Sequence, residues 1–528
     1  MPDQNPPQPN PDHYLVSASG RLGDPPQSAV TEVARILDRA IQQQPESGLV
    51  IHLHGGLVSR EYALNNIAAP LTERYREAKA YPLFFVWESG FMEAILNNKK
   101  DLLKDPAFRE LVKKVSEWAL SKVSVTGGVS FRGAAGQTIN DVETFRAEYD
   151  QWFDNARDVP PVEESDIAGD AGIATRAAAG LPNVDALASD IEIALDNDPA
   201  FKKAIAEAYN AANPPAVDIA TRGSGTTSRA GVLYLSPKAL DEMFPPEEAP
   251  AQPADKVRTR GIFTWTKVAI FVAKMVIAVV KRFRDDRDHG IYCTVVEEVL
   301  RSAYGDLVGA AIWNQMKKDT LDSFAAGADS CGLLVTRKLK ALEDAGARFK
   351  KITLVGHSTG AIYICNFLDA ANAVGLTTPI QVVFLAPAIT CQRFAEALDH
   401  HETTSLRDFR MFAMRDAREK EDQLIKPLYT RSLLYFVSGL LEGDVVDGSW
   451  EGTLDMPLVG MERFYTVAAF SDDPQVKRVW RFLNAKPNRM VWSQAEGAGA
   501  GLNSDSQHHG DFDNDESTLK SLVEIIRG

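Results

Sequence analysis

The chain is poor in cysteine, with four among 528 residues, and these four stand far apart. Their spacing matches neither a disulfide framework nor a metal-binding motif, which excludes a small cross-linked secreted fold and a cysteine-based metal site. We expect them to be reduced, mostly buried thiols, as in proteins of reducing compartments. They are Cys293, Cys331, Cys365 and Cys391.

Positive charge is also in deficit, because 57 lysines and arginines face 72 acidic residues and leave a formal net charge of −15. A protein that binds nucleic acid needs a basic face for the phosphates, so we expect no nucleic-acid partner. The polar, proline-rich start lacks the basic residues and apolar run of a secretory signal. We therefore expect a cytoplasmic location, with residues 1–12 as a disordered arm.

No long apolar run is free of charge. Ile262–Val280 is the most hydrophobic stretch and approaches the length of a bilayer span, but it contains Lys267 and Lys274. A lysine at the centre of a spanning helix costs about 2.5–3.5 kcal/mol, so a transmembrane helix is not expected. Three interpretations stay open: a buried helix with a wet lysine stripe, a lid over an acyl pocket, or contact with a membrane surface through 262–284.

Short apolar, β-branched runs alternate with helical patterns in two parts of the chain. Gly48–His54 and Tyr81–Trp87 read as strands with a helix between them, which is a βαβ unit. Four more strands are predicted later, so the class is α/β with a doubly wound, mostly parallel sheet. The core comprises 13–90 and 290–528, and 91–289 is a large, mainly helical insertion or cap with linkers near 158–170 and 244–256. The later strands are Lys351–Val355, Gln381–Leu385, Asp408–Met414 and Arg489–Trp492.

The ten residues Lys351–Gly360, KITLVGHSTG, are the most informative stretch. A buried strand is followed at once by Gly-His-Ser-Thr-Gly and then by an apolar helix. The two flanking glycines fit a turn that is too tight for Cβ atoms at those places. This turn pushes Ser358 out of the sheet above a helix N-terminus.

A strand, a Gly-x-Ser-x-Gly turn and a helix together resemble the nucleophile elbow of the α/β-hydrolase superfamily. The turn His54-Gly55-Gly56-Leu57 after an early strand is similar to the His-Gly-Gly motif of lipases and esterases. The resemblance covers about residues 45–90 and 290–528. It implies the α/β-hydrolase fold and an oxyanion hole formed by the N–H groups of Thr359 and of Gly56 or Leu57.

The same resemblance implies a catalytic triad in the order serine, acid, histidine. Ser358 is the nucleophile, and His509 is favoured over His508 as the base because Gly510 follows it, as in many members. The acid is expected after the strand before last, where Asp416 is our choice and Glu419 and Asp422 are the reserves. A serine hydroxyl needs such a base, and the base needs an acidic residue to orient it.

These residues predict a serine hydrolase of the esterase or lipase kind, which cleaves a carboxylic ester through an acyl-enzyme. The substrate is a small-molecule or lipid ester; thioesters and amides would suit the same machinery. The alternatives are a peripheral membrane lipase or phospholipase, and a non-catalytic scaffold that keeps the fold. No cofactor or metal is expected, since Asp511, Asp513 and Asp515 lack the glycine and the terminal acid of a calcium loop. We treat His289, Glu297 and Glu298 as structural.

Overall fold

The structure is a computed structural model, and its central element is a seven-stranded sheet in which every pairing is parallel. The order is β1-β3-β2-β7-β8-β9-β12. The strands are β1 Tyr14–Ala18, β2 Leu49–Leu53, β3 Tyr81–Glu88, β7 Ile352–His357, β8 Ile380–Leu385, β9 Phe409–Met414 and β12 Met490–Ser493. The residues described are 8–56, 58–88, 102–127, 131–132, 138–139, 142–155, 163–164, 180–212, 235–245, 256–305, 310–442, 444–446, 449–451 and 455–528.

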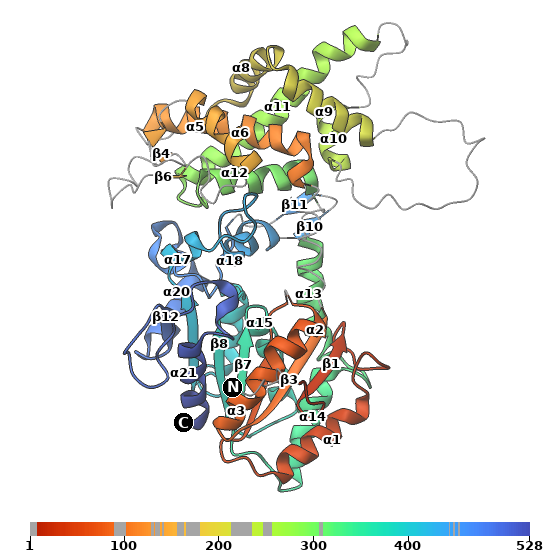
Figure 1. The fold of residues 1–528 in the computed structure, drawn as a ribbon, viewed down its shortest axis with the longest axis vertical. Helices are drawn as coiled ribbons and strands as arrows, with labels where there is room; N and C mark the ends of the chain where they lie inside the picture. The colour runs from red at the N-terminus through yellow and green to blue at the C-terminus, as the bar shows by residue number, and fades with distance from the viewer. Residues whose placement is uncertain are drawn as a thin grey trace, which may run out of the picture.

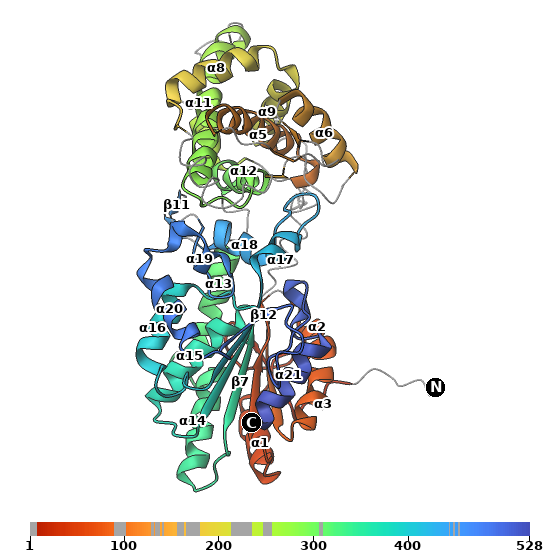
Figure 2. The ribbon, with the colours of Figure 1, turned by 90° about the vertical axis from the view of Figure 1, so that its left-hand side faces the viewer.

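Helices cover both faces of the sheet, because successive strand residues point to opposite sides and both sides are apolar. In β2, Leu49 and Ile51 belong to one buried cluster, and Val50 belongs to the other. The first cluster includes α1 Val30–Gln42, α14 Cys331–Asp344, α15 Gly360–Ala373, α16 Cys391–His401 and α20 Pro474–Asn484. The second includes η1 Ala63–Ala68, α3 Ala69–Glu77 and α21 Glu516–Arg527, on the opposite side of the sheet in Figure 2. The α/β class and the parallel sheet are confirmed.

A separate helical body lies beyond the sheet and its helices (Figure 1). Its last helix, α12, packs against α5 and α11, so the body continues past the predicted boundary at 289/290. The helices are α5 Pro106–Gly127, α6 Val142–Asn155, α8 Val184–Asp196, α9 Pro199–Ala212, α10 Pro237–Met243, α11 Lys256–Arg284 and α12 Ile291–Val299, with η4 Leu300–Tyr304 after them. A small sheet of β4 Phe131–Arg132, β5 Thr138–Ile139 and β6 Glu163–Glu164 accompanies them, and the predicted linkers near 158–170 and 244–256 fall mostly outside the described residues.

Short elements join the two bodies. In Figure 1, α17 and α18, which follow the carboxyl end of β9, lie between the sheet and the helical body. These joining elements are α13 Ala310–Asp322, α17 Asp416–Glu421, α18 Leu433–Phe436, η6 Val437–Leu441, the β10 Asp444–Val446 and β11 Ser449–Glu451 hairpin, and α19 Arg463–Thr466. The remaining short elements are α2 Arg60–Tyr62, η7 Ala468–Phe470 and η8 His509–Asp511.

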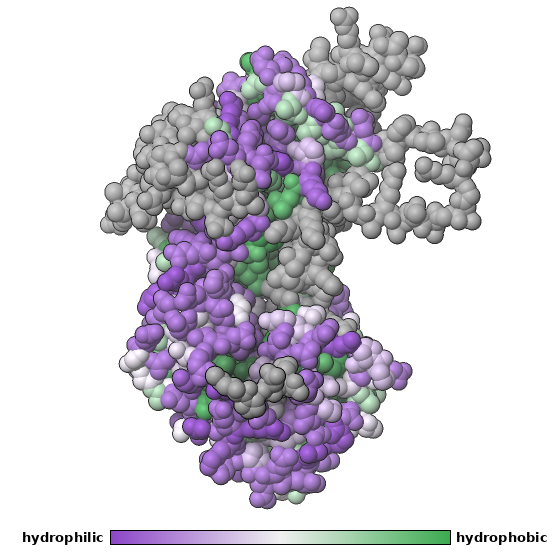
Figure 3. All heavy atoms as spheres, viewed as in Figure 1, coloured by the Kyte–Doolittle hydropathy of each residue, from purple (hydrophilic) through white to green (hydrophobic). Residues whose placement is uncertain are grey.

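The apolar helix α11 is packed inside the helical body. It contacts α5, α8, α10 and α12, and the side chains of Phe271 and Val276 are at most 4% exposed. Lys274 is 57% exposed and pairs with Glu242 at 3.1 Å, as the interpretation of a buried helix with a lysine stripe requires. On the face drawn in Figure 3, the outer surface of the helical body is mainly hydrophilic where it is coloured. Among the described residues, no helix has both the length and the hydropathy that a bilayer span requires.

Two predictions from the sequence differ from the structure. Strand β1 at the sheet edge was not among the predicted strands, although it begins two residues after the arm that we expect to be disordered. Residues 1–7 of that arm lie outside the described residues, but Asp12 pairs with Arg39 at 2.6 Å and is therefore fixed to α1. All four cysteines are buried and free, as expected.

Gly360 begins α15 where this helix lies against the backbone of β2, and its replacement tests the fold. A Cβ built there would lie 2.1 Å from the Leu53 carbonyl oxygen, which is backbone and cannot rotate away. Gly360→Ala should therefore destabilise the protein by about 3 kcal/mol, seen as a lower urea midpoint. Gly180→Ala, whose Cβ meets nothing within 4 Å, is the control and should change stability by less than about 0.5 kcal/mol. Equal midpoints for the two variants would contradict this packing.

Candidate active site

Ser358 stands at the turn between β7 and α15 with a backbone φ of 54°, in the left-handed region that L side chains rarely adopt. Two glycines make this turn possible. A Cβ on Gly356 would meet the backbone of Gly360 at 2.7 Å. The Ser358 N–H donates to the Leu385 carbonyl at 2.9 Å, and the Ser358 carbonyl accepts from Ala388 N–H at 3.1 Å. The loop after β8 therefore holds the strained residue in place.

The glycine turn after β2 lies against this elbow. Gly55 packs on Ser358, since a Cβ there would be 3.2 Å from the Ser358 Cβ, and the Gly56 N–H donates to the Thr359 hydroxyl at 2.6 Å. The Gly56 N–H is thus occupied by a side chain instead of pointing to an open site. Thr359 is the N-cap of α15, whose first N–H groups lack partners within the helix. Leu57 lies outside the described residues.

The terminal loop brings His509 to the elbow. Its ring stacks on the ring of His357, with centroids 5.2 Å apart, and its carbonyl accepts from His357 Nε2 at 2.9 Å. Within the described residues, the buried Ser358 hydroxyl and both ring nitrogens of His509 have no hydrogen-bond partner. His508 is instead exposed and pairs with Asp511 at 3.1 Å. The structure thus places His509 in one cavity with the serine but without a direct bond to it.

Asp416 and His509, which the sequence pairs, are not joined. The Asp416 carboxylate accepts from the Tyr435 hydroxyl at 2.6 Å and pairs with Lys420 at 2.8 Å. Glu419 is 1% exposed, and burial raises its pKa well above the usual range because the charged form is disfavoured there. The carboxylate beside His509 is Asp422, whose Oδ2 accepts from the His509 backbone N–H at 2.9 Å.

A cavity of about 280 Å³ opens above Ser358. Its walls come from the turn after β2, the elbow, the segment after α17 and the terminal loop. They are mainly apolar, and Asp422 and Asp513 supply negative charge. Within the described part of the chain, no lysine or arginine lines it. The lining residues are Gly55, Val58, Tyr62, Ile67, His357, Ser358, Asp422, Gln423, Leu424, Leu433, His508, His509, Gly510 and Asp513.

His357 and Asp513 form a second buried pair that the sequence did not single out. Their side chains are 3.4 Å apart. Burial lowers the pKa of His357, but the Asp513 carboxylate and the His509 carbonyl outweigh it, so the pKa is raised from 6.5. Burial raises the pKa of Asp513, and the charge of His357 reverses this, so that pKa is lowered from 3.8. Asp513 is four residues after His509, and this proximity in the sequence was the available signal.

The electrostatics keep His509 neutral. Burial lowers the pKa of its imidazole well below 6.5, and the neighbouring charge on His357 lowers it further, against the opposing effect of Asp513. Burial also raises the pKa of Asp422, while the hydrogen bond from His509 N–H opposes that rise. A neutral imidazole can accept a proton, as a general base must. Arranged around one cavity are therefore a hydroxyl on a strained turn, a neutral imidazole and a carboxylate.

Comparison of this chain with protein-family models, with curated proteins and with solved structures found no match.

The pair of His357 and Asp513 predicts a pH-dependent contribution to stability. The raised pKa of His357 gives a contribution that is full below pH 6.5 and is lost as the pH rises through the folded value. The lowered pKa of Asp513 gives one that is present above pH 3.8 and is lost as the pH falls through the folded value.

Asp513→Asn should therefore lower the melting temperature most between pH 5 and pH 6.5, and the deficit should shrink toward pH 9. The measurement is thermal unfolding of both proteins across this range. Asp472→Asn, at a carboxylate that is 99% exposed, is the control and should follow the wild type throughout. A constant deficit for Asp513→Asn from pH 5 to pH 9 would refute the ionic pairing.

Proposed function

We propose that this protein is a serine hydrolase with the α/β-hydrolase fold that cleaves an uncharged carboxylic ester through an acyl-enzyme. One observation carries the proposal: Ser358, with φ at 54° between two glycines that admit no Cβ, stands in a cavity beside the neutral imidazole of His509. Strain of this kind persists where the surrounding structure enforces it, and it concentrates at catalytic sites.

In the proposed reaction, the Ser358 Oγ attacks the ester carbonyl carbon, and its proton passes to a ring nitrogen of His509. The carbonyl oxygen becomes negative and accepts from the Thr359 N–H. A second donor comes from the turn of residues 55–57, where the hydroxyl of Thr359 must first release the Gly56 N–H. The imidazolium then protonates the leaving alkoxide. The same imidazole then takes a proton from water, which attacks the acyl carbon. The bond to Ser358 Oγ breaks, the carboxylic acid leaves, and the imidazolium returns the proton to Ser358.

We assign the orienting carboxylate to Asp422 instead of Asp416. Asp422 already accepts from the backbone N–H of His509, whereas Asp416 is occupied by Tyr435 and Lys420. In structures without substrate, catalytic hydrogen bonds are often long and tighten only when the substrate is bound. A rotation of the Asp422 or His509 side chain would then join the carboxylate to the ring.

The cavity supports a compact, uncharged acyl group. Its volume of about 280 Å³ lies at the lower end of the range of roughly 300–1,000 Å³ that is usual for ligand pockets. The apolar side chains of Ile67, Leu424 and Leu433 suit a hydrocarbon chain, and the carboxylates of Asp422 and Asp513 repel anions. These features favour a short-chain ester over a phospholipid or a phosphate-bearing thioester. The burial of α11 likewise supports the esterase over a lipase that docks to membranes through residues 262–284.

One observation favours a non-catalytic scaffold as the second candidate. The Ser358 hydroxyl and the ring nitrogens of His509 are not hydrogen-bonded to each other in this structure. A protein that has lost its chemistry would tolerate such a separation, whereas an enzyme would close it on binding substrate. The scaffold predicts an unreactive Ser358, so the reactivity of this hydroxyl separates the two functions.

Reaction with a fluorophosphonate probe tests the nucleophile. The folded wild type should become labelled, and Ser358→Ala should lose the label entirely, because the probe bonds only to an activated serine. Ser471→Ala, at an exposed serine outside the cavity lining, should label like the wild type. An unlabelled wild type that melts cooperatively would instead establish the scaffold.

The choice of acid is tested by kinetics on a short-chain nitrophenyl ester. Asp422→Asn should lower kcat by about 100-fold or more, because an amide cannot hold the imidazole in the productive tautomer. Asp416→Asn removes a carboxylate that is bonded elsewhere and should lower kcat by at most about tenfold. If the two variants exchange these rankings, Asp416 is the acid, as the sequence first predicted.

A further inference from the structure

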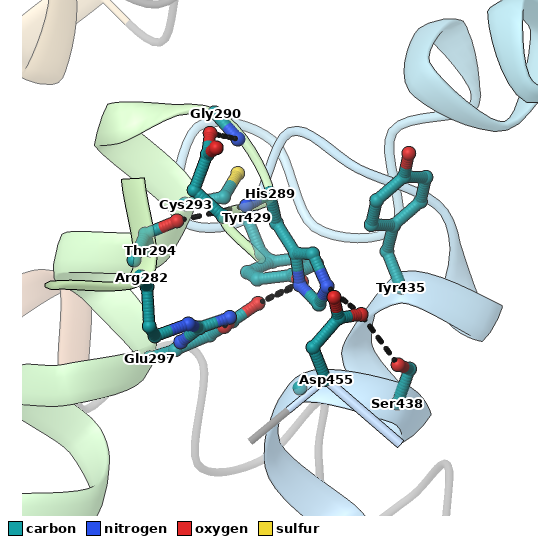
Figure 4. Close-up of polar contacts among 12 residues, drawn as sticks. Arg282, His289, Gly290, Cys293, Thr294, Glu297, Tyr429, Tyr435, Ser438 and Asp455 are labelled. Carbon is teal, nitrogen blue, oxygen red and sulfur yellow. Dashed lines mark hydrogen bonds and ion pairs between the residues drawn. The ribbon is translucent and has the colours of Figure 1, made fainter. Parts of the chain in front are cut away.

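A network of buried charged groups lies outside the cavity, where the helical body meets the segments that follow β9 (Figure 4). Its centre is His289, which is 1% exposed. Nδ1 of this ring is 2.7 Å from Glu297 Oε1, and Nε2 is 2.8 Å from Asp455 Oδ1. A carboxyl oxygen thus lies within hydrogen-bond distance of each ring nitrogen, and His289 links Glu297 to Asp455.

The network extends to both sides of His289. On the side of the helical body, Arg282 pairs with Glu297 at 2.6 Å and with Glu298 at 3.0 Å. Both glutamates thus face the same guanidinium, although adjacent helical residues point in different directions. On the other side, Arg463 pairs with Asp455 at 2.7 Å. All these side chains are at most 5% exposed, so each charge depends on its partner for stabilisation.

Two tyrosine hydroxyls connect this network to the wall of the cavity. Tyr429 donates to Glu297 Oε1 at 2.5 Å. Tyr435 donates to Asp416 Oδ1 at 2.6 Å and accepts from Arg463 at 3.4 Å, while its ring stands edge-on to His289 with centroids 4.7 Å apart. Both rings are fully buried.

The segment 422–433 contains Tyr429 and follows α17, whose first residue accepts from the Tyr435 hydroxyl. It supplies Asp422, Gln423, Leu424 and Leu433 to the cavity, and Asp422 accepts from the His509 backbone N–H. Asp416 begins α17, which leads directly into this segment, and Tyr429 lies within it. One path from the helical body to the candidate base therefore runs through Glu297, Tyr429 and the segment to Asp422, beside the contacts of α12 with Pro427 and Thr430.

Little freedom exists for the network to rearrange. Gly439 of η6 lies against Glu297, where a Cβ would meet the carboxylate at 2.6 Å. Loss of one hydroxyl would leave a buried carboxylate oxygen with one fewer donor. Loss of the Tyr429 hydroxyl would also remove one of the bonds that join the segment to α12, beside those of Pro427 with Tyr292 and of Thr430 with Cys293. A displacement of about 1 Å in a catalytic group is enough to change a rate by roughly 100-fold.

We propose that Tyr429 and Tyr435 are positioning residues through which the His289 network of the helical body fixes the segment 422–433, and with it the His509 loop. Neither tyrosine lines the cavity, so both act through the segment. The effect on rate rests on the proposed hydrolase function, whereas the effect on the order of the segment does not.

The test compares Tyr429→Phe and Tyr435→Phe with Tyr304→Phe as a matched control. Tyr304 also donates from a buried ring to a carboxylate, that of Asp105 at 2.7 Å, but it touches neither the network nor the segment. Hydrogen exchange followed by mass spectrometry reports the order of peptides covering 422–433 and 508–513. Steady-state kinetics on the short-chain ester reports kcat and KM.

We expect exchange in both peptides to be at least about fivefold faster in Tyr429→Phe and Tyr435→Phe, and unchanged in Tyr304→Phe. We also expect kcat to fall about tenfold in the first two variants alone. Exchange at the wild-type rate in those two would overturn the proposal. If the wild type has no esterase activity, the proposed function fails, but the exchange result still decides whether the two tyrosines position the segment. If the enzyme is active and the variants show faster exchange with an unchanged kcat, the link to His509 is overturned.

Discussion

The left-handed backbone at Ser358 is the constraint on which the site depends. That conformation is stable only because β7 and α15 meet without Cβ atoms at Gly356 and Gly360, so that the turn fits against the backbone of β2. The loop after β8 then fixes the residue through both of its backbone polar groups. Ser358 therefore stands where the cavity and the terminal loop meet. The groups around its Oγ determine what the site can do chemically.

The local parts of this arrangement could be predicted from the sequence, because they depend on residues that are adjacent in the chain. A β-branched run, two glycines and an apolar helix identify the strand, the turn and the following helix, and a similar pattern identifies β2 and its glycine turn. The choice between His508 and His509 was likewise accessible, since Gly510 marks the turn of the terminal loop. His509 is buried and His508 is exposed, and the catalytic role of His509 stays a prediction.

The sequence could not show which of three neighbouring carboxyl groups lies beside His509. Asp416, Glu419 and Asp422 lie within seven residues on one short helix and its end, and their surroundings come from distant parts of the chain. Tyr435 and Lys420 bind Asp416, burial raises the pKa of Glu419, and the backbone N–H of His509 donates to Asp422. For the same reason, the sequence did not indicate that Glu297 and Glu298 both face Arg282. Hydrogen bonds between residues far apart in the chain produce no recognisable spacing pattern in the sequence.

Isolation of the covalent intermediate tests most directly whether Ser358 is the nucleophile. A short-chain nitrophenyl ester is mixed with the protein, the reaction is quenched with acid within milliseconds, and peptides are mapped by mass spectrometry. We predict the mass of one acyl group on the peptide that contains Ser358, and no such adduct in Ser358→Ala. Hydrolysis of the ester with no adduct on Ser358, or with the acyl group on another residue, would contradict the role of the strained turn.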